Sequence, residues 1–258
     1  MNILRDKIRK RKKICGPFLN MGEVYVADIF AREPYDYVWV DTEHSSMDYG
    51  SILNCLTVLK AHQMPAVVRL QMDNYNHTKR ILEMGPDGVI FPNVETAEYA
   101  DKCMRSTLYP PLGNRGAGPL LGNHYGRETI VEYASEQTEN LCRFIQIESV
   151  KAIENLPEIM KNPYIDGYIL GPCDLSGALG ILGEIYHEKN ISQVKKAIKL
   201  LKEHGKFVGV AFTSIEEEEQ RRWLELGVDM IASGADFDFI FQNSRKNARQ
   251  LQRLFKEY

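Results

Sequence analysis

The chain has 258 residues, of which 26% are charged, and a formal net charge of −3. A chain of this length buries roughly 70–75% of the surface that its unfolded form exposes, so its core needs no disulfide or metal to hold it. The near-neutral charge and the dispersed basic residues argue against nucleic acid as a partner. The one basic run, RDKIRKRKK at 5–13, is interpreted as a solvated amphipathic helix at the N-terminus.

The cysteines indicate a reducing environment. There are five of them, scattered and never in a C-x-x-C pair, which is typical of a cytosolic protein and not of a disulfide framework or a structural zinc site. No window approaches the ~18 apolar residues of a membrane span, and the charged N-terminus is followed by no apolar stretch that would make a signal peptide. We therefore expect a cytoplasmic protein with no membrane association.

Short β-rich runs recur along the chain, and each is followed by a helical stretch. Most are continuous apolar runs, as strands buried on both faces must be. The runs are GPFLNM (16–21), YVWVD (37–41), AVVRLQ (66–71), GVIFPN (88–93), RFIQIE (143–148), GYILGP (167–172), FVGVAF (207–212) and DMIASG (229–234).

Amphipathic segments lie between these runs, and several end in Gly, the usual residue just past a helix. The clearest are 51–62, 77–85, 191–205 and 214–227. Eight strands that alternate with helices predict a closed (β/α)8 TIM barrel, with residues 1–258 as one domain that also carries an N-terminal and a C-terminal helix.

One long connection breaks the alternation. Residues 109–128, YPPLGNRGAGPLLGNHYGRE, are rich in Gly and Pro, and a connection of this length is usually functional or disordered. Its GNRGAG follows a helix and a turn instead of a strand, so it is only a weak phosphate-binding signal.

Polar residues stand where the predicted strands end, which is where barrels of this kind place their active sites. The second run ends in Asp41, followed by Glu43 and His44, and Asp174 comes just after the sixth. The other polar residues at strand ends are Arg69, Gln71, Asn93, Gln146 and Glu148.

Glu148 and Asp174 are the candidate metal ligands. They would project from adjacent strands into one opening, and two carboxylates without a Cys/His cluster suit Mg²⁺ or Mn²⁺. The alternative for Asp174 is a cap on a helix that begins near Leu175. The pair taken together favours metal binding.

Arg69 and His44 are the other candidates. A guanidinium inside an apolar strand needs a partner, so Arg69 is either one half of a structural ion pair or a clamp for a substrate carboxylate or enolate oxygen. His44 is the one histidine at a strand end, and Asp41 is placed to orient its ring, as a general base requires. A surface imidazole is the alternative for His44. Four other histidines, His62, His77, His187 and His204, are expected on the surface at helices or their ends. His124, in the long connection, could reach substrate.

These motifs together resemble those of the HpcH/HpaI aldolase/citrate lyase family of metal-dependent pyruvate aldolases. The resemblance runs from about Gly16 to the ASGAD stretch at 232–236. The motifs that carry it are VDTEHS, VVRL, KRILEMGPDGVIFPNVETAEYA, YPPLGNRGAGP, QIESVKAIENL and DGYILGPCDLSGALG.

The resemblance implies a role for each candidate residue. Glu148 and Asp174 bind a divalent metal, His44 paired with Asp41 is the base, and Arg69 stabilises the pyruvate enolate and its carboxylate. Gln146 supports the metal shell, Glu43 orders a metal-bound water, and the backbone amides of Cys173 and Asp174 hold the substrate carboxylate at a helix start.

Some residues depart from the family pattern. Ser45 replaces a common Gly, Cys173 replaces a common Ala, RLQMDNYN replaces the commoner RVPxND, and GPLLGNHYG lacks a basic residue. We interpret these as changes in the loops that select the aldehyde, with the chemistry kept.

The resemblance implies reversible cleavage of a 4-hydroxy-2-oxoacid to pyruvate and an aldehyde, with Mg²⁺, Mn²⁺ or Co²⁺ as cofactor. A Schiff-base mechanism is disfavoured, because none of the eight strands ends in the lysine that it needs. Two alternatives stay open: a citramalyl- or acyl-CoA-type lyase of the same superfamily, and a non-catalytic or altered-specificity 2-oxoacid-binding barrel. The family also implies a homo-oligomer, often a hexamer, in which the C-terminal helix swaps between subunits.

Overall fold

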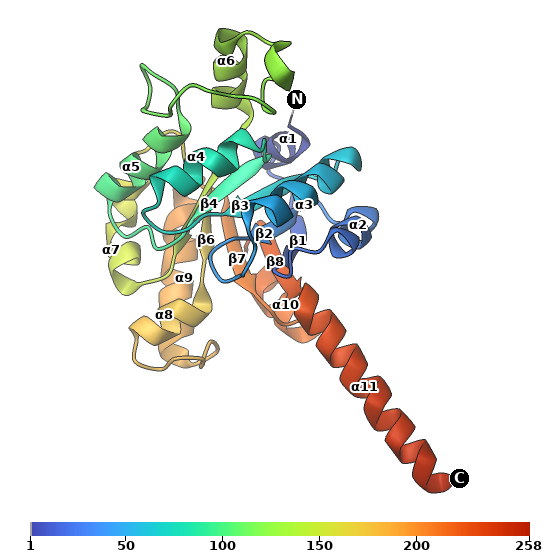
Figure 1. The fold of residues 1–258 in the computed structure, drawn as a ribbon. Coiled ribbons are helices and arrows are strands. Elements are labelled where there is room, and N and C mark those ends of the chain that lie inside the picture. Colours follow the sequence, from blue (N-terminus) through green and yellow to red (C-terminus); the bar gives the residue numbers. More distant parts are fainter. Residues whose placement is uncertain (1) are drawn as a thin grey trace.

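A computed structural model describes residues 2–258 and shows a closed barrel of eight parallel strands (Figure 1). The strands follow one another around the barrel in chain order, and β8 closes it by pairing with β1. The predicted (β/α)8 barrel and all eight predicted strand positions are confirmed. The strands are β1 (Ile14–Leu19), β2 (Val38–Asp41), β3 (Ala66–Arg69), β4 (Gly88–Phe91), β5 (Cys142–Ile147), β6 (Gly167–Leu170), β7 (Val208–Phe212) and β8 (Met230–Ala235).

Helices follow the strands and cover the outside of the barrel (Figure 1). Several begin at a side-chain cap, such as Asp48 before α3 and Ser149 before α7. The helices are α1 (Ile3–Arg9), α2 (Val24–Arg32), α3 (Tyr49–Ala61), α4 (Tyr75–Glu83), α5 (Ala97–Thr107), the 3₁₀ turn η1 (His124–Gly126), α6 (Ile130–Asn140), α7 (Val150–Ile159), α8 (Pro172–Ala178), α9 (Glu188–Glu203), α10 (Glu217–Glu225) and α11 (Asp236–Glu257). Among residues 2–258, no helix is long and apolar enough to cross a membrane.

The strands read as unbroken apolar runs because both of their faces are buried. One set of side chains, including Trp39, Phe144 and Ile169, fills the inside of the barrel. The other set, including Val40, Ile145 and Leu170, packs under the helices. Successive residues of a strand thus serve two separate cores.

The N-terminal helix closes one end of the barrel. Leu4 and Ile8 of α1 are buried and belong to the inner core. Arg5 Nη1 lies 2.6 Å from Asp166 Oδ2, just before β6. The expectation of a solvated helix over 5–13 is therefore wrong in part: the helix spans 3–9, and its apolar face plugs the barrel.

The long connection between α5 and α6 runs to this same closed end. Arg115 is buried and places Nη2 3.3 Å from Glu83 Oε1, at the end of α4. Further along, His124 lines a cavity together with Asn2 and Asp87, residues at the N-terminal end of the strands. His124 therefore does not reach the substrate site of its own barrel, the possibility that the sequence had left open, because the strands end on the opposite side.

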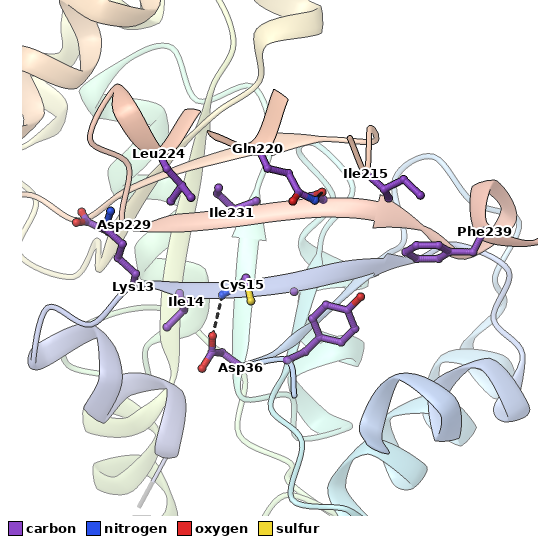
Figure 2. Close-up of a pocket in the computed structure, with 13 residues that line it drawn as sticks. Lys13, Ile14, Cys15, Asp36, Ile215, Gln220, Leu224, Asp229, Ile231 and Phe239 are labelled. Carbon is purple, nitrogen blue, oxygen red and sulfur yellow. Dashed lines mark hydrogen bonds between the residues drawn. The ribbon is translucent and has the colours of Figure 1, made fainter. Parts of the chain in front are cut away.

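The C-terminal helix α11 leaves the barrel instead of covering it (Figure 1). It has 22 residues, a length of about 33 Å at 1.5 Å per residue, and beyond Phe239 every residue except Leu254 is exposed. The outer wall where β8 meets β1 consequently has a cavity of about 410 Å³. Figure 2 shows it between α10 and β1, with apolar walls from Ile215, Leu224, Ile231 and Phe239.

Candidate active site

A cavity of about 460 Å³ opens at the C-terminal ends of the strands, and we call it the mouth. Every predicted site residue except Glu43 lines it, and Glu43 contacts two of those that do. Residues far apart in the chain thus meet in one chamber: Asp41, His44, Arg69, Gln146, Glu148, Cys173 and Asp174.

Asp41 and Arg69 form a buried ion pair across two neighbouring strands. The ladder between β2 and β3 sets these residues side by side. Arg69 Nε donates to Asp41 Oδ1 at 3.0 Å and Nη2 donates to Oδ2 at 2.5 Å, a two-pronged geometry that holds the guanidinium plane. Burial would raise the pKa of Asp41, but the hydrogen bonds and charge of Arg69 outweigh it and lower that pKa below its usual value. The structural ion pair considered for Arg69 is present, and its guanidinium also lines the mouth.

Asp41 does not orient the His44 ring. Its Oδ1 accepts from the backbone amides of Glu43 and His44, and its Oδ2 accepts from Asn20 Nδ2. The predicted contact is therefore wrong, because the carboxylate turns toward Arg69. The acid beside the imidazole is Glu43, whose Oε2 lies 3.8 Å from His44 Nε2 and 3.2 Å from Arg69 Nη1. Burial raises the pKa of Glu43.

Glu148 follows β5 directly and is 5% exposed. Its Oε2 accepts from the Asn93 amide at 3.0 Å, and its Oε1 accepts from Gln146 Nε2 at 2.5 Å. Burial raises the pKa of Glu148 to about 7 against the effect of the Asn93 amide, and the charge of Asp174 adds to the rise. A side chain on Gly171 would place its Cβ 2.6 Å from Glu148 Oε1, so the glycine leaves room for this carboxylate.

Asp174 lies in the first turn of α8 and is exposed to the mouth. It does not cap that helix, which begins at Pro172 with Gly171 at the cap position. The capping alternative is therefore wrong. Among residues 2–258, its carboxylate has neither a hydrogen-bond nor an ion-pair partner in the structure, and it lies close enough to raise the pKa values of both Glu43 and Glu148.

The donor atoms around Glu148 and Asp174 fit a hard divalent cation. Two carboxylates come together with the Oε1 atom of Gln146, which is buried and has no hydrogen-bond partner among the described residues. All are oxygen ligands, as Mg²⁺ and Mn²⁺ prefer. No group of three His, Cys, Asp or Glu side chains that could hold a metal occurs among residues 2–258. The chain would thus supply few ligands and leave several positions to water or substrate, which is how Mg²⁺ is usually bound.

One buried histidine was missed by the sequence prediction. His77 is 3% exposed instead of lying on the surface. Thr42 Oγ1 donates to the Arg69 carbonyl, so it must accept from His77 Nε2 at 2.8 Å, and His77 Nδ1 then accepts from Tyr49 at 3.1 Å. Burial, and secondarily the charge of Arg80, lower the pKa of His77, which keeps the ring neutral. This chain of bonds fixes the loop after β2 to the end of β3.

Comparison with known proteins supports one family. Residues 15–242 match the family described as HpcH/HpaI aldolase/citrate lyase. The chain is 29% identical over 248 residues to a hydroxypyruvate/pyruvate aldolase from Pseudomonas aeruginosa, covering 96% of this chain and 92% of that one. It is also 29% identical over 235 residues to a 4-hydroxy-2-oxo-heptane-1,7-dioate aldolase from Shigella flexneri, covering 91% of this chain and 87% of that one.

Solved structures agree with the fold. A family protein from Burkholderia cenocepacia superposes with a TM-score of 0.91 at 25% identity, covering 98% of this chain and all of that one. The protein CitE from Mycobacterium tuberculosis, in complex with magnesium and pyruvate, superposes with a TM-score of 0.55 at 16% identity over 87% of this chain and 86% of that one. The second likeness concerns the fold alone.

The bonds around Thr42 lead to a stability prediction. Thr42→Val removes the acceptor of the buried His77 N–H, and leaving such a donor unpaired costs about 1–3 kcal/mol. We expect urea unfolding to show this loss for Thr42→Val, whereas Thr42→Ser, which keeps the hydroxyl, stays close to the parent. Equal stability of the Val and Ser variants would contradict the assigned bonds.

Proposed function

Because the chain belongs to the HpcH/HpaI aldolase/citrate lyase family, we propose that its mouth catalyses the metal-dependent, reversible aldol cleavage of a 4-hydroxy-2-oxoacid to pyruvate and an aldehyde. The observation that carries the proposal is the meeting of Glu148, Asp174, Arg69 and His44 in one cavity. Within residues 2–258 the Asp174 carboxylate is unpaired, and the pKa of Glu148 is raised to about 7. A divalent cation bound between these two acids would favour the charged form of both.

Glu148 and Asp174 are the residues that would hold the metal, with Gln146 beside them. A divalent cation bound there supplies Lewis-acid stabilisation of charge on the 2-oxo oxygen. The amides of Cys173 and Asp174, in the first turn of α8, have no carbonyl within the helix and would bind the substrate carboxylate.

The remaining residues move the proton and stabilise the enolate. In cleavage, His44 accepts the proton of the C4 hydroxyl, the C3–C4 bond breaks, and its electron pair passes into the enolate of pyruvate. Arg69 supplies positive charge at that enolate, and Asp41 holds the guanidinium in place through two hydrogen bonds. Glu43, within 3.8 Å of His44 Nε2, favours the protonated imidazole that forms. Protonation of the enolate at C3 then completes pyruvate.

A Schiff-base route lacks its nucleophile. No lysine lines the mouth among the residues that the structure describes, and Lys206, just before β7, donates to the Met160 carbonyl instead. A non-catalytic barrel would bind pyruvate but would not exchange its methyl protons, so proton exchange separates that alternative from an aldolase.

We expect Glu148→Gln to reduce metal-dependent pyruvate release at least 100-fold, because the amide cannot neutralise a cation. The measurement is pyruvate released from a panel of 4-hydroxy-2-oxoacids, with and without chelator. Glu95→Gln is the matched control: Glu95 accepts from the neighbouring Ser149 but does not line the mouth. Release that chelation leaves unchanged would contradict the proposal.

The raised pKa of Glu148 gives the metal affinity a defined pH dependence. Below about pH 7 the carboxyl holds a proton that the cation must displace, so affinity falls with decreasing pH, by up to about tenfold per unit. Calorimetric titration with Mn²⁺ at pH 6 and pH 8 tests this. Glu148→Gln should bind weakly at both values and lose most of the difference. An equal affinity of the parent at both pH values would exclude Glu148 as the titrating ligand.

We also propose a homo-oligomer, a hexamer by family analogy, in which α11 of one chain packs on the barrel of another. The support is the exposed helix together with the apolar cavity that it leaves at the junction of β8 and β1 (Figure 2). Leu251, Leu254 and Phe255 share one helix face, as the apolar side of a packed helix would. The five cysteines are free, which agrees with the proposed location in the cytoplasm.

Phe255→Glu should weaken the assembly, because Phe255 is 73% exposed in the single chain and would become buried against a neighbour. Sedimentation velocity at micromolar concentration measures the effect. Gln252→Glu, an exposed polar position on the same helix, is the control. A monomeric parent protein would contradict the proposed assembly.

A further inference from the structure

The mouth has two chemically different halves. The charged side chains come from the ends of β2, β3, β5 and the start of α8. The other side is apolar, and its residues come from a continuous arc, since β7, β8 and β1 are neighbours in the closed barrel. They are Phe18 on β1, Ala211 and Phe212 on β7, Ile185 after α8 and Phe237 at the start of α11. Two polar residues also lie on this arc: Asn20, which donates to Asp41, and Thr213, just after β7.

The apolar half is set firmly in the fold. Phe18 is buried, and its ring centroid lies 5.1 Å from that of Trp39 in the inner core. Ile185 belongs to the loop between α8 and α9, which Asn190 anchors. This fully buried amide donates to the carbonyls of Pro172 and Ile185 at 3.0 and 2.9 Å. The position of Ile185 over the mouth therefore follows from buried hydrogen bonds.

The positive charges of the mouth are already in use. Arg69 and His44 are its only basic residues among those the structure describes, and both lie in the charged half. Arg69 is paired with Asp41 and Glu43. A second carboxylate on the substrate would meet apolar side chains, at a cost that no free cation of this chain offsets.

We propose that the group carried on the aldehyde carbon is uncharged and apolar, and that it lies against Phe18, Ile185 and Phe237. This inference depends on the proposed aldol cleavage and narrows its substrate to monocarboxylic 4-hydroxy-2-oxoacids with an aliphatic tail. Cleavage breaks the C3–C4 bond and turns the C4 hydroxyl into the aldehyde carbonyl. The hydroxyl proton passes to His44, and the electron pair of the broken bond passes to the enolate of pyruvate. The long connection cannot supply a missing cation within its own chain, because its residues around His124 lie at the closed end of the barrel.

The test compares two substrates that differ only in a terminal carboxylate: 4-hydroxy-2-oxohexanoate and 4-hydroxy-2-oxoheptane-1,7-dioate. We expect the parent enzyme to have at least tenfold higher kcat/KM for the hexanoate. Ile185→Lys places a cation on the apolar side and should shift the ratio at least tenfold toward the dioate. Leu182→Lys is the matched control: it lies in the same loop, is 75% exposed and does not line the mouth, so it should leave the ratio unchanged.

A second measurement separates the aldolase chemistry from the inferred substrate. It follows the exchange of the C3 protons of pyruvate by NMR in D₂O, in a Mg²⁺ buffer free of Mn²⁺. This exchange needs the enolate but no aldehyde. Exchange together with equal or better cleavage of the dioate would overturn the inferred substrate and leave the aldolase chemistry standing. Exchange without cleavage of the hexanoate would also overturn it. Absence of both exchange and cleavage would overturn the aldolase proposal and the inference with it.

Discussion

The ion pair between Asp41 and Arg69 is the interaction on which the site depends. A guanidinium placed inside the apolar end of β3 is costly unless a partner meets it with good geometry, and the pairing of β2 with β3 puts the carboxylate directly beside it. The pair holds one positive charge rigidly in the mouth. Its second role is local: the same carboxylate accepts the amides of Glu43 and His44, which shapes the loop that carries the candidate base.

This single arginine does not balance the acids around it. Asp41, Glu43 and Glu148 lie around one guanidinium, and Asp174 lies near Glu148. Burial, with the charge of Asp174 adding to it, raises the pKa of Glu148 to about 7. A divalent cation would remove the same imbalance and let both Glu148 and Asp174 ionise. The excess of negative charge therefore accounts for the expected metal dependence.

The sequence was sufficient to predict the barrel and the charged residues that meet in the mouth, but not the apolar residues of its other side. Strands buried on both faces appear as apolar runs, and the polar residues that end them, such as Arg69 and Glu148, converge because all eight strands are parallel. The predictions that were wrong concerned contacts between different helices and strands. Arg69 is the partner of Asp41 because of the register between β2 and β3. The burial of His77 depends on its hydrogen bond to the hydroxyl of Thr42, in the loop after β2. The path of the long connection depends on the contact between Arg115 and Glu83. The departure of α11 from the barrel agrees with the helix exchange that the family resemblance implied, although helical periodicity alone does not indicate it.

The apolar cavity on the outer wall and the apolar half of the mouth both lie near the start of α11. The proposed subunit contact and the proposed aldehyde site are therefore close together in this fold. The central claim, however, concerns the metal. It is tested most directly by a crystal structure with Mn²⁺ and pyruvate, using anomalous scattering to locate the ion. The account predicts one peak bonded to oxygens of Glu148 and Asp174, with pyruvate between it and Arg69. Manganese bound elsewhere, with these two carboxylates free of it, would contradict the account.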